Sequence, residues 1–394
     1  MTARSVITPR IRSFIRTLLF SLPLAILIGC GGSKSATTTP PPPVGVSISV
    51  SGQTVTKARV AGDRIVLLEE RLTSLFESGP NRALAISQSD GNSIRTFTPP
   101  AGWSLVDFVV HPSGDISAVL TTAREVRIVR LDSNGMIRSD QPFVDSAAAA
   151  DPFFNYAGGI KDDTALQPAL MHDAARLAPL GESLALVLRT GRNAIVAYRL
   201  DPDASGAYQQ SWRTLVEPGA SILGIGLISG SFDVFGQLEN HIRVYVDLDS
   251  AATLAIGVVN ANESNFTFRA HAQYFNQPIS ATSGVLLTRL ATTDGHRLGS
   301  TVVDTQNRSE LHGVRAMPHG FVLTGRVLSE VRSDGTGWNA FTALIGPDGT
   351  LTSYNLIDVD RGDVLFDAAP LPSGRFLAVG TTGYVQNPSG ESIS

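Results

Sequence analysis

The chain of 394 residues has one cysteine, Cys30, and three lysines, Lys34, Lys57 and Lys161. A disulfide needs two thiols, so the sequence excludes an intrachain disulfide framework. The formal net charge is −4, which rules out a strongly basic surface. The mildly acidic surface that this charge implies repels phosphate backbones, so we expect no nucleic-acid partner.

Standard catalytic, metal-binding and nucleotide-binding motifs are also missing. There is no H-E-x-x-H zinc motif, no G-x-S-x-G nucleophile elbow, no Ser-x-x-Lys motif, no phosphate-binding Walker loop and no dinucleotide fingerprint. The seven histidines are scattered along the chain. Two of them, His111 and His319, stand in predicted turns, where we expect them to be exposed. The sequence therefore predicts no catalytic residue and no metal site of a standard type.

Long apolar runs are absent except near the start, where Leu18–Ile28 is interrupted only by Ser21 and Pro23. This run is too short for a spanning helix, which needs about 20 apolar residues. The segment before it contains four arginines and no acid. A basic head followed by a short apolar run is typical of an export signal, which we assign to residues 1–29. Without the signal, the formal charge of the chain becomes −8.

The end of this signal reads Leu27-Ile28-Gly29-Cys30, which resembles the lipobox of bacterial lipoproteins. The resemblance implies that Cys30 is lipidated, that cleavage occurs before it, and that the chain is tethered to a membrane of the cell envelope. Because Gly31 follows, the family pattern implies the outer membrane in a host with two membranes. The alternative is an ordinary secretory signal with a chance cysteine. A lipidated Cys30 would also exclude thiol catalysis.

Residues 30–43 are rich in Gly, Ser, Thr and Pro, and we interpret them as a tether behind the lipidated cysteine. Residues 44–394 then form the folded body. This body alternates short β-rich runs with turn residues, as an all-β domain does.

Two turn signatures recur in the body. The first is x-Pro-x-Gly between two apolar runs, in which proline presets one backbone angle and glycine supplies a positive φ. The second is an Asp-Gly or Asn-Gly hairpin tip, which favours tight turns between antiparallel strands. The first signature ends at Gly114, Gly181, Gly320 and Gly374, with weaker copies at Gly62 and Gly230; the second ends at Gly91, Gly135, Gly295 and Gly349, with a longer version at Asp201–Gly206.

The two signatures interleave, which predicts two hairpins, and hence four strands, in each repeat unit. The spacing of the first glycines is near 50 residues, except for a gap of 90 before Gly320, in which we place a degenerate unit near residue 275. The sequence therefore predicts a β-propeller of seven four-stranded blades, with six to eight as the range. A pair of β-sandwiches or a β-solenoid is the alternative.

Residues 341–350 resemble a hairpin of bacterial envelope propeller repeats. The last unit is short: Ser394 comes before its second hairpin is due. Either an N-terminal strand such as Val44–Val50 completes the last blade, or the repeat is incomplete at the C-terminus.

One insertion, Ser146–Asp173, lengthens a repeat unit and carries aromatic residues. Loops that depart from the period of a scaffold are frequent sites of function. We therefore predict a binding loop with the contact residues Phe153, Phe154, Tyr156, Lys161 and Asp162. The alternative is a neutral insertion whose aromatic residues pack back onto the body.

A weak calcium candidate is Asp201-x-Asp203-x-Ser205, which is similar to the start of a calcium loop. Trp212 occupies the twelfth position, where that loop has a bidentate glutamate. A hairpin turn explains the same residues without metal, and we expect no other cofactor.

Together these features predict a lipid-anchored envelope protein that acts as a non-catalytic scaffold for a protein or a glycan. In architecture alone it resembles the propeller lipoprotein of the outer-membrane assembly machinery, although it lacks the tryptophan-containing blade motif of that family. The alternative is a glycan lyase or hydrolase that uses carboxylates on the propeller axis. Paired axial carboxylates or an axial metal would favour the enzyme.

Overall fold

The structure is a computed structural model of the chain. It describes residues 54–71, 81–122, 125–145, 175–189, 195–218, 242–248, 253–260, 271–272, 274–281, 283–329, 337–359, 362–371, 374–382, 385–386 and 392–393. Within these residues, no helix has the length and apolar character needed to cross a membrane. The predicted signal, lipobox, tether and binding loop lie outside the described residues, and so does Val44–Val50.

The described elements are strands that follow one another in the chain. They are β1 (Thr54–Ala61), β2 (Arg64–Arg71), β3 (Asn81–Gln88), β4 (Ser93–Phe97), β5 (Ser104–Val110), β6 (Ile116–Thr121), β7 (Val126–Leu131), β8 (Ile137–Phe143), β9 (Ala175–Leu180), β10 (Ser183–Arg189), β11 (Ile195–Pro202), β12 (Tyr208–Glu217), β13 (Ile242–Leu248), β14 (Thr253–Asn260), β15 (Gly284–Ala291), β16 (Arg297–Asp304), β17 (Ser309–Met317), β18 (Gly320–Leu328), β19 (Trp338–Ile345), β20 (Leu351–Ile357), β21 (Val364–Pro370), β22 (Phe376–Thr381), β23 (Val385–Gln386) and β24 (Ser392–Ile393).

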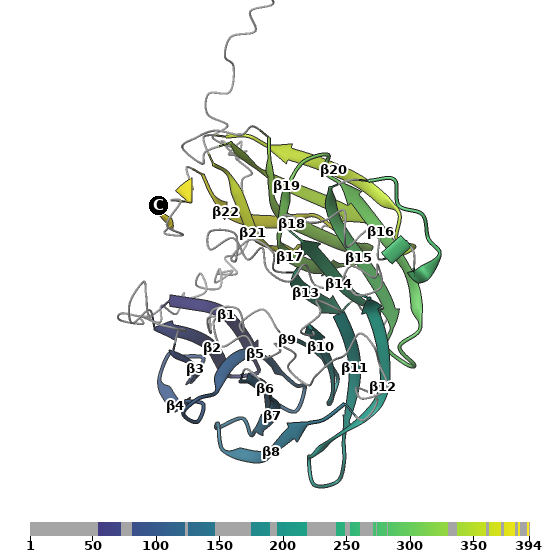
Figure 1. The fold of residues 1–394 in the computed structure, drawn as a ribbon. Coiled ribbons are helices and arrows are strands. Elements are labelled where there is room, and N and C mark those ends of the chain that lie inside the picture. Colours follow the sequence, from purple (N-terminus) through teal and green to yellow (C-terminus); the bar gives the residue numbers. More distant parts are fainter. Residues whose placement is uncertain are drawn as a thin grey trace, which may run out of the picture. The chain divides into compact units, whose positions relative to one another are not determined.

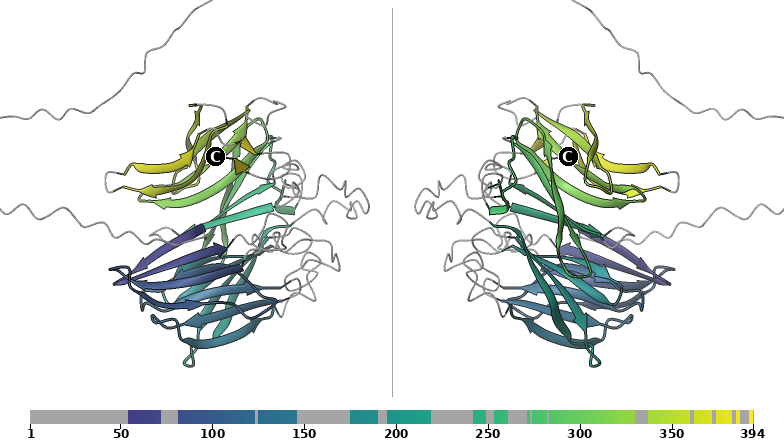
Figure 2. Two further views of the ribbon diagram at one scale, coloured as in Figure 1. Left: turned by 90° about the vertical axis from the view of Figure 1, so that its left-hand side faces the viewer. Right: turned by 90° about the vertical axis from the view of Figure 1, so that its right-hand side faces the viewer.

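The strands form antiparallel sheets in chain order. The described residues contain five four-stranded sheets, which are β1–β4, β5–β8, β9–β12, β13–β16 and β17–β20, followed by the pairs β21–β22 and β23–β24. We call the first five sheets 1 to 5 and the β21–β22 pair sheet 6. Figure 2 shows the sheets from two sides, with the twist that antiparallel strands acquire.

Both predicted hairpins of the repeat are confirmed. The first turn signature joins the first two strands of a sheet, as at Gly114 between β5 and β6 and at Gly181 between β9 and β10. Both glycines have positive φ, 85° and 66°. The second signature joins the last two strands, as at Gly91, Gly135 and Gly349.

Successive apolar side chains along a strand point to opposite faces of its sheet, which explains how the sheets stack. In β10, Leu184, Leu186 and Leu188 pack with residues of sheet 2, whereas Ala185 and Val187 pack with residues of sheet 4. Four apolar clusters fill the four interfaces between sheets 1 and 5 in this way. A sheet that is apolar on both faces needs a neighbour on each side, so the sheets form a consecutive series.

The first strands of successive sheets also contact one another. β1 contacts β5, β5 contacts β9, β9 contacts β13, β13 contacts β17, and β17 contacts β21. These six inner strands lie toward a common centre, and the later strands of each sheet lie outward (Figure 1). Four-stranded meanders stacked face to face around their first strands are β-propeller blades, so the predicted all-β propeller is confirmed.

The predicted number of seven blades is wrong. The described residues show five four-stranded blades and the two-stranded sheet 6. The error came from the gap of 90 residues, in which we placed an extra unit near residue 275. Residues 261–283 instead connect β14 to β15, which pair within one sheet, so the described residues around position 275 belong to sheet 4.

Candidate functional site

Charged residues recur on the inner strands. Seven of them influence one another electrostatically, with cations on sheets 1, 3 and 5 and aspartates on sheets 2, 4 and 6. These seven residues, which we call the axial charge cluster, are Lys57 and Arg59 on β1, Asp107 on β5, Arg176 on β9, Asp247 on β13, Arg315 on β17 and Asp367 on β21.

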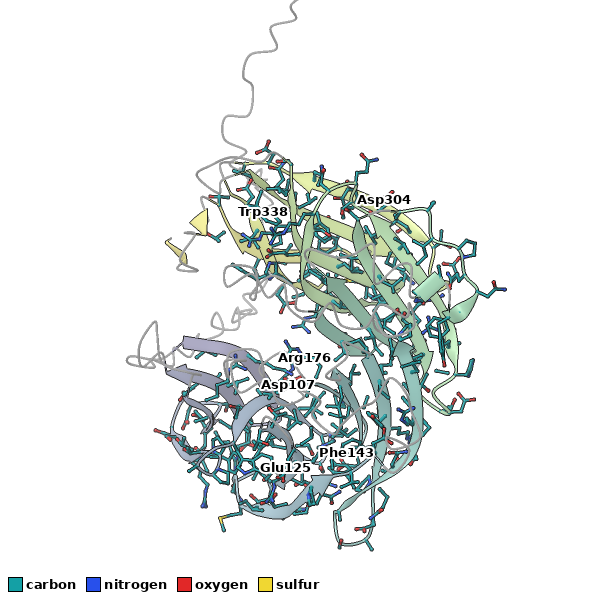
Figure 3. The ribbon with its side chains drawn as sticks, viewed as in Figure 1. Asp107, Glu125, Phe143, Arg176, Asp304 and Trp338 are labelled. Atoms are coloured by element: carbon teal, nitrogen blue, oxygen red, sulfur yellow. The ribbon has the colours of Figure 1, made fainter. Side chains whose placement is uncertain are left out.

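Asp107 connects the first three inner strands. Its Oδ1 lies 2.5 Å from Lys57 Nζ and also accepts a hydrogen bond from its neighbour's backbone, Phe108 N, at 2.9 Å. Its Oδ2 accepts a hydrogen bond from Leu177 N at 2.9 Å, next to Arg176 on β9. Figure 3 labels Asp107 and Arg176, which come from neighbouring strands. Both carboxylate oxygens therefore already have partners.

The same pattern recurs two sheets further on. Asp247 Oδ1 accepts a hydrogen bond from Leu248 N at 2.9 Å, and its Oδ2 accepts one from Ala316 N on β17 at 2.8 Å. Asp367 Oδ2 lies 2.6 Å from Arg315 Nη2, and its Oδ1 accepts a hydrogen bond from Ala368 N at 2.8 Å. Each aspartate thus bonds its own strand and an inner strand of a neighbouring sheet.

Local backbone irregularities lie next to several of these charges. The strand register shifts between Val55 and Lys57, between Leu105 and Asp107, and between Leu365 and Asp367. A β-bulge of this kind bends the strand and re-aims a side chain. The bulges therefore accompany the placement of Lys57, Asp107 and Asp367 among the inner strands.

The cluster shifts the pKa values of its members. Burial lowers the pKa of Lys57 to about 8, against the attraction of Asp107. Burial alone would raise the pKa of Asp107, but Lys57, Arg176 and the hydrogen bonds hold it below its ordinary value. Burial also opposes the charge of Arg315, yet Asp367 and the other aspartates raise its pKa overall. The charged form of Asp107 is therefore stabilised.

Arg59 differs from its neighbours. Burial and the nearby charge of Arg315 lower its pKa, although Asp107, Asp247 and Asp367 act in the opposite direction. Its guanidinium donates a hydrogen bond to Ala58 O at 2.9 Å. Within the described part of the chain it forms no salt bridge, so Arg59 is a half-buried cation without a directly bonded carboxylate.

The turns of the first signature build a cavity at one end of the same inner strands. Its volume is about 640 Å³. The β1–β2, β5–β6 and β9–β10 turns line it, through residues that include Gly62, Ser113 and Gly181. Val60, which follows Arg59, also lines it. The cavity and the axial charge cluster therefore share β1, β5 and β9.

Asp107 does not have the character of the acid catalyst of a glycosidase. An acid catalyst in such an enzyme needs a raised pKa, whereas the pKa of Asp107 is lowered and its oxygens are bonded to Lys57 and two backbone amides. Within the described residues, no group of three or more His, Cys, Asp or Glu side chains is placed to hold a metal ion.

A carboxylate whose pKa is raised by burial lies elsewhere, at Glu217 on the last strand of sheet 3. Its Oε2 lies 2.9 Å from Nδ1 of His271, and Thr288 donates a hydrogen bond to its Oε1 at 3.2 Å. The side chains of Glu217 and His271 are 1% and 0% exposed. This pair is therefore part of the packing between sheets 3 and 4.

The prediction that His111 is exposed is wrong. Its ring is buried and contacts Gly181 O at 2.9 Å, Ser117 Oγ at 2.8 Å and Tyr208 Oη at 3.0 Å. The proline-glycine turn that it precedes folds back toward sheet 3, which covers the ring. His319, at the equivalent turn of sheet 5, is exposed as predicted.

The candidate calcium residues lie in the β11–β12 turn. Asp203 Oδ1 accepts hydrogen bonds from Ser205 N at 2.8 Å and Ser205 Oγ at 2.6 Å. Asp201 binds Arg199 Nε at 2.8 Å and the hydroxyls of Ser183 and Ser211. Both carboxylates therefore have protein partners in the turn.

The remaining predicted site residues lie outside the described part of the chain. They are the lipobox residues Leu27, Ile28, Gly29 and Cys30, and the loop residues Phe153, Phe154, Tyr156, Lys161 and Asp162.

Sequence reasoning missed the axial charge cluster, although a signal for it exists. Arg176 and Arg315 each stand five residues before the turn glycine of their sheet. Asp107 and Asp367 each stand seven residues before theirs, in the shared pattern Asp-x₄-Pro-Ser-Gly. Aligning the turns of alternate sheets would have revealed both patterns.

Comparisons with known proteins return similar structures only. No protein-family model and no curated protein matches the chain. The Pan2 WD40 domain of Neurospora crassa is 8% identical, with a TM-score of 0.43 over 81% of this chain and 69% of its own. The β-propeller domain of the Trilobed protease from Pyrococcus furiosus is 9% identical, with a TM-score of 0.42 over 87% and 83%. BamB from Moraxella catarrhalis is 11% identical, with a TM-score of 0.35 over 88% and 82%.

Proposed function

We propose that the protein is a non-catalytic β-propeller scaffold of the cell envelope that binds a protein or a glycan. The observation that carries this proposal is the axial charge cluster, in which Asp107, Asp247 and Asp367 are all bonded to backbone amides of the inner strands. Carboxylates held in this way serve to fix the inner strands. Rigid strands that carry turns and loops at their ends suit recognition.

The predicted loop 151–163 is the proposed contact element on this scaffold. Aromatic side chains on a loop can anchor a partner, because they bury a large area with few rotatable bonds. Phe153, Phe154 and Tyr156 would supply the anchors, and Lys161 and Asp162 would supply polar contacts at the rim.

Affinity capture tests the proposal. The protein is immobilised and exposed to a detergent extract of the source envelope and, separately, to a glycan array. We expect one of the two to give a specific partner, and a variant without residues 151–163 to lose it while keeping its melting temperature. Retention of the partner by this variant would refute the loop assignment, and no partner in either format would refute the scaffold.

We also propose that Cys30 carries the lipid that holds the scaffold at the membrane, in the outer membrane of a host that has one. The support is the order of basic residues, short apolar run and Leu-Ile-Gly-Cys. Labelled palmitate should enter the wild-type protein and not a Cys30→Ser variant, which should leave the membrane fraction. A labelled Cys30→Ser variant would show that the anchor is not at this residue.

A further inference from the structure

The cavity at the β1–β2, β5–β6 and β9–β10 turns has a volume of about 640 Å³, which is within the usual range of small-ligand sites. It lies where β9 ends, at Pro179 and Gly181. The predicted loop 151–163 instead leads into the start of β9, at Ala175. The cavity is therefore a second candidate contact site, separate from the loop.

Two of the three turns are bonded to each other. The carboxylate of Glu182, in the β9–β10 turn, accepts hydrogen bonds from Ser113 N and from Ser113 Oγ, each at 2.9 Å. His111 Nδ1 lies 2.9 Å from Gly181 O. These contacts join the turns of sheets 2 and 3, so this side of the cavity is formed before any ligand binds. A pre-formed site does not lose affinity to the ordering of its own residues.

Most polar side chains of the described lining are already bonded within the protein. Asp63 and Arg64 pair at 2.7 Å. The hydroxyl of Ser113 donates to Glu182, and both ring nitrogens of His111 have partners. A sugar that entered would lose hydrogen bonds between its hydroxyls and water and find few to replace them, which is unfavourable.

Aliphatic side chains make up much of the remaining described lining, namely Val60, Val110, Pro112 and Pro179. Two glycines, Gly62 and Gly181, leave open space beside them, since no atom lies within 4 Å of a Cβ added to either. Val60 is 72% exposed, so it presents apolar surface to water. Covering such surface is favourable by about 25 cal/mol per Å². An apolar side chain therefore gains more from this cavity than a polar group does.

The described lining carries no net charge. Asp63 and Arg64 neutralise each other, and Glu182 behind Ser113 lies 2.8 Å from Arg130 Nη2. Burial lowers the pKa of His111, which favours its neutral ring. A charged group would give up hydration here without an opposite charge to bind, so the lining favours an uncharged ligand.

We propose that this cavity receives one apolar side chain, of about the size of leucine, from an uncharged segment of a partner protein. The inference rests on the proposed scaffold function and narrows its partner to a protein. A peptide side chain fits better than a lipid chain, because the exposure of Val60 shows that the cavity is open to water. Much of a longer acyl chain would stay hydrated there, which is unfavourable.

Calorimetric titration of the purified protein tests the site. The probes are capped tripeptides with leucine, alanine or aspartate between two alanines, the disaccharide chitobiose, and 1-octanol as an alkyl chain. We expect the leucine peptide to bind at least tenfold more tightly than every other probe. The proposal fails if the leucine peptide does not bind, if the alanine or aspartate peptide binds equally well, or if chitobiose or octanol binds as tightly.

Variants locate the site. Val60→Asp should weaken binding of the leucine peptide at least tenfold, because it places a charge where the apolar contact forms, and Val60→Ala should weaken it less. Val144→Asp is the matched control, since Val144 is 70% exposed and does not line the cavity. Both valines are exposed, so the melting temperatures should stay near that of the wild type. Unchanged affinity in Val60→Asp, or an equal loss in Val144→Asp, would overturn the proposal.

The two proposals fail in different ways. If the leucine peptide binds through Val60 but no macromolecule is captured from the envelope extract or the glycan array, the cavity site stands and the scaffold function falls. If a protein is captured equally by the wild type and by Val60→Asp, or if only a glycan is captured, the scaffold function stands and the cavity site falls.

Discussion

The ionisation of Lys57 can be measured directly, because its surroundings lower its pKa. Its pKa is lowered to about 8 because burial disfavours the charged amine. The chain has only three lysines, so each gives its own signal after reductive methylation with ¹³C. We expect one methyl resonance to titrate near pH 8.

An Asp107→Asn variant identifies that resonance. Asp107 attracts the charged amine and raises its pKa against burial, so removing this charge should lower the titration midpoint of Lys57 further. A midpoint that stays fixed in the variant, or the absence of a resonance that titrates near pH 8 in the wild type, would contradict the described position of Lys57.

The same shift makes folding depend on pH. The folded protein releases the Lys57 proton near pH 8, whereas the unfolded chain holds it up to about the ordinary value of 10.5. Between these values the unfolded state binds more protons, so Lys57 makes the free energy of unfolding rise with pH, on the order of 1 to 3 kcal/mol. Urea denaturation at pH 7.5 and 9.5 should show this rise relative to a Lys57→Met variant, which lacks it. Parallel pH profiles would contradict the shift.

Glu217 and His271 allow a buried pair to be compared with an exposed one. Removing the hydrogen-bond partner of a buried polar group leaves that group unsatisfied, which costs about 1 to 3 kcal/mol. His271→Ala should lower the free energy of unfolding by about this amount or more, measured in urea. His296→Ala is the control, because His296 lies 2.7 Å from Asp294 with both side chains more than half exposed. Similar losses in the two variants would show that Glu217 is not buried as described.

At the scale of the element, the sequence predicted the hairpins well because each depends on a few adjacent residues. Proline and glycine at fixed spacing determine a turn such as 111–114, whatever lies around it. The prediction of the number of blades was wrong because that number depends on the longer connections, and residues 261–283 inside sheet 4 were counted as a unit.

The axial charge cluster was missed for a related reason, since residues such as Arg59 and Arg315 meet only when six inner strands converge.

Sheet 5 contains a position where the strands approach too closely for any side chain. A Cβ on Gly325 of β18 would lie 2.1 Å from Glu310 O and 2.7 Å from Cε1 of Phe341. The first contact is with the backbone of the paired strand β17, which cannot move without breaking the ladder. Gly325→Ala should therefore lower the free energy of unfolding by about 2 kcal/mol or more.

The control for this prediction is Gly374→Ala in the β21–β22 turn. No atom lies within 4 Å of its added Cβ, and its φ of 76° leaves only the backbone strain. That strain costs about 1 kcal/mol. Equal melting temperatures for the two variants would show that β17 and β18 are less closely spaced than described.

At the scale of the whole molecule, stability is distributed over separate interfaces. Each of the four apolar clusters joins two neighbouring sheets, and each sheet shares clusters only with the sheets beside it. Molecules built from stacked units gain stability from interfaces between neighbours. A defect in one interface should therefore loosen the adjoining sheets before it reaches distant ones.

Hydrogen exchange measured by mass spectrometry tests this. Leu84 lies in the cluster between sheets 1 and 2, and Leu323 lies in the cluster between sheets 4 and 5; both are 0% exposed. Leu84→Ala should speed exchange in β1–β8 and leave β17–β20 near the wild-type rate, and Leu323→Ala should do the reverse, because local opening needs less free energy than global unfolding. Each substitution should cost about 2 to 5 kcal/mol, so the affected sheets would exchange clearly faster. Equal acceleration of exchange in all five sheets by either variant would contradict this prediction. It would mean that the propeller unfolds as a single cooperative unit, joined through inner-strand bonds such as those of Asp107 and Asp247 to the next sheet.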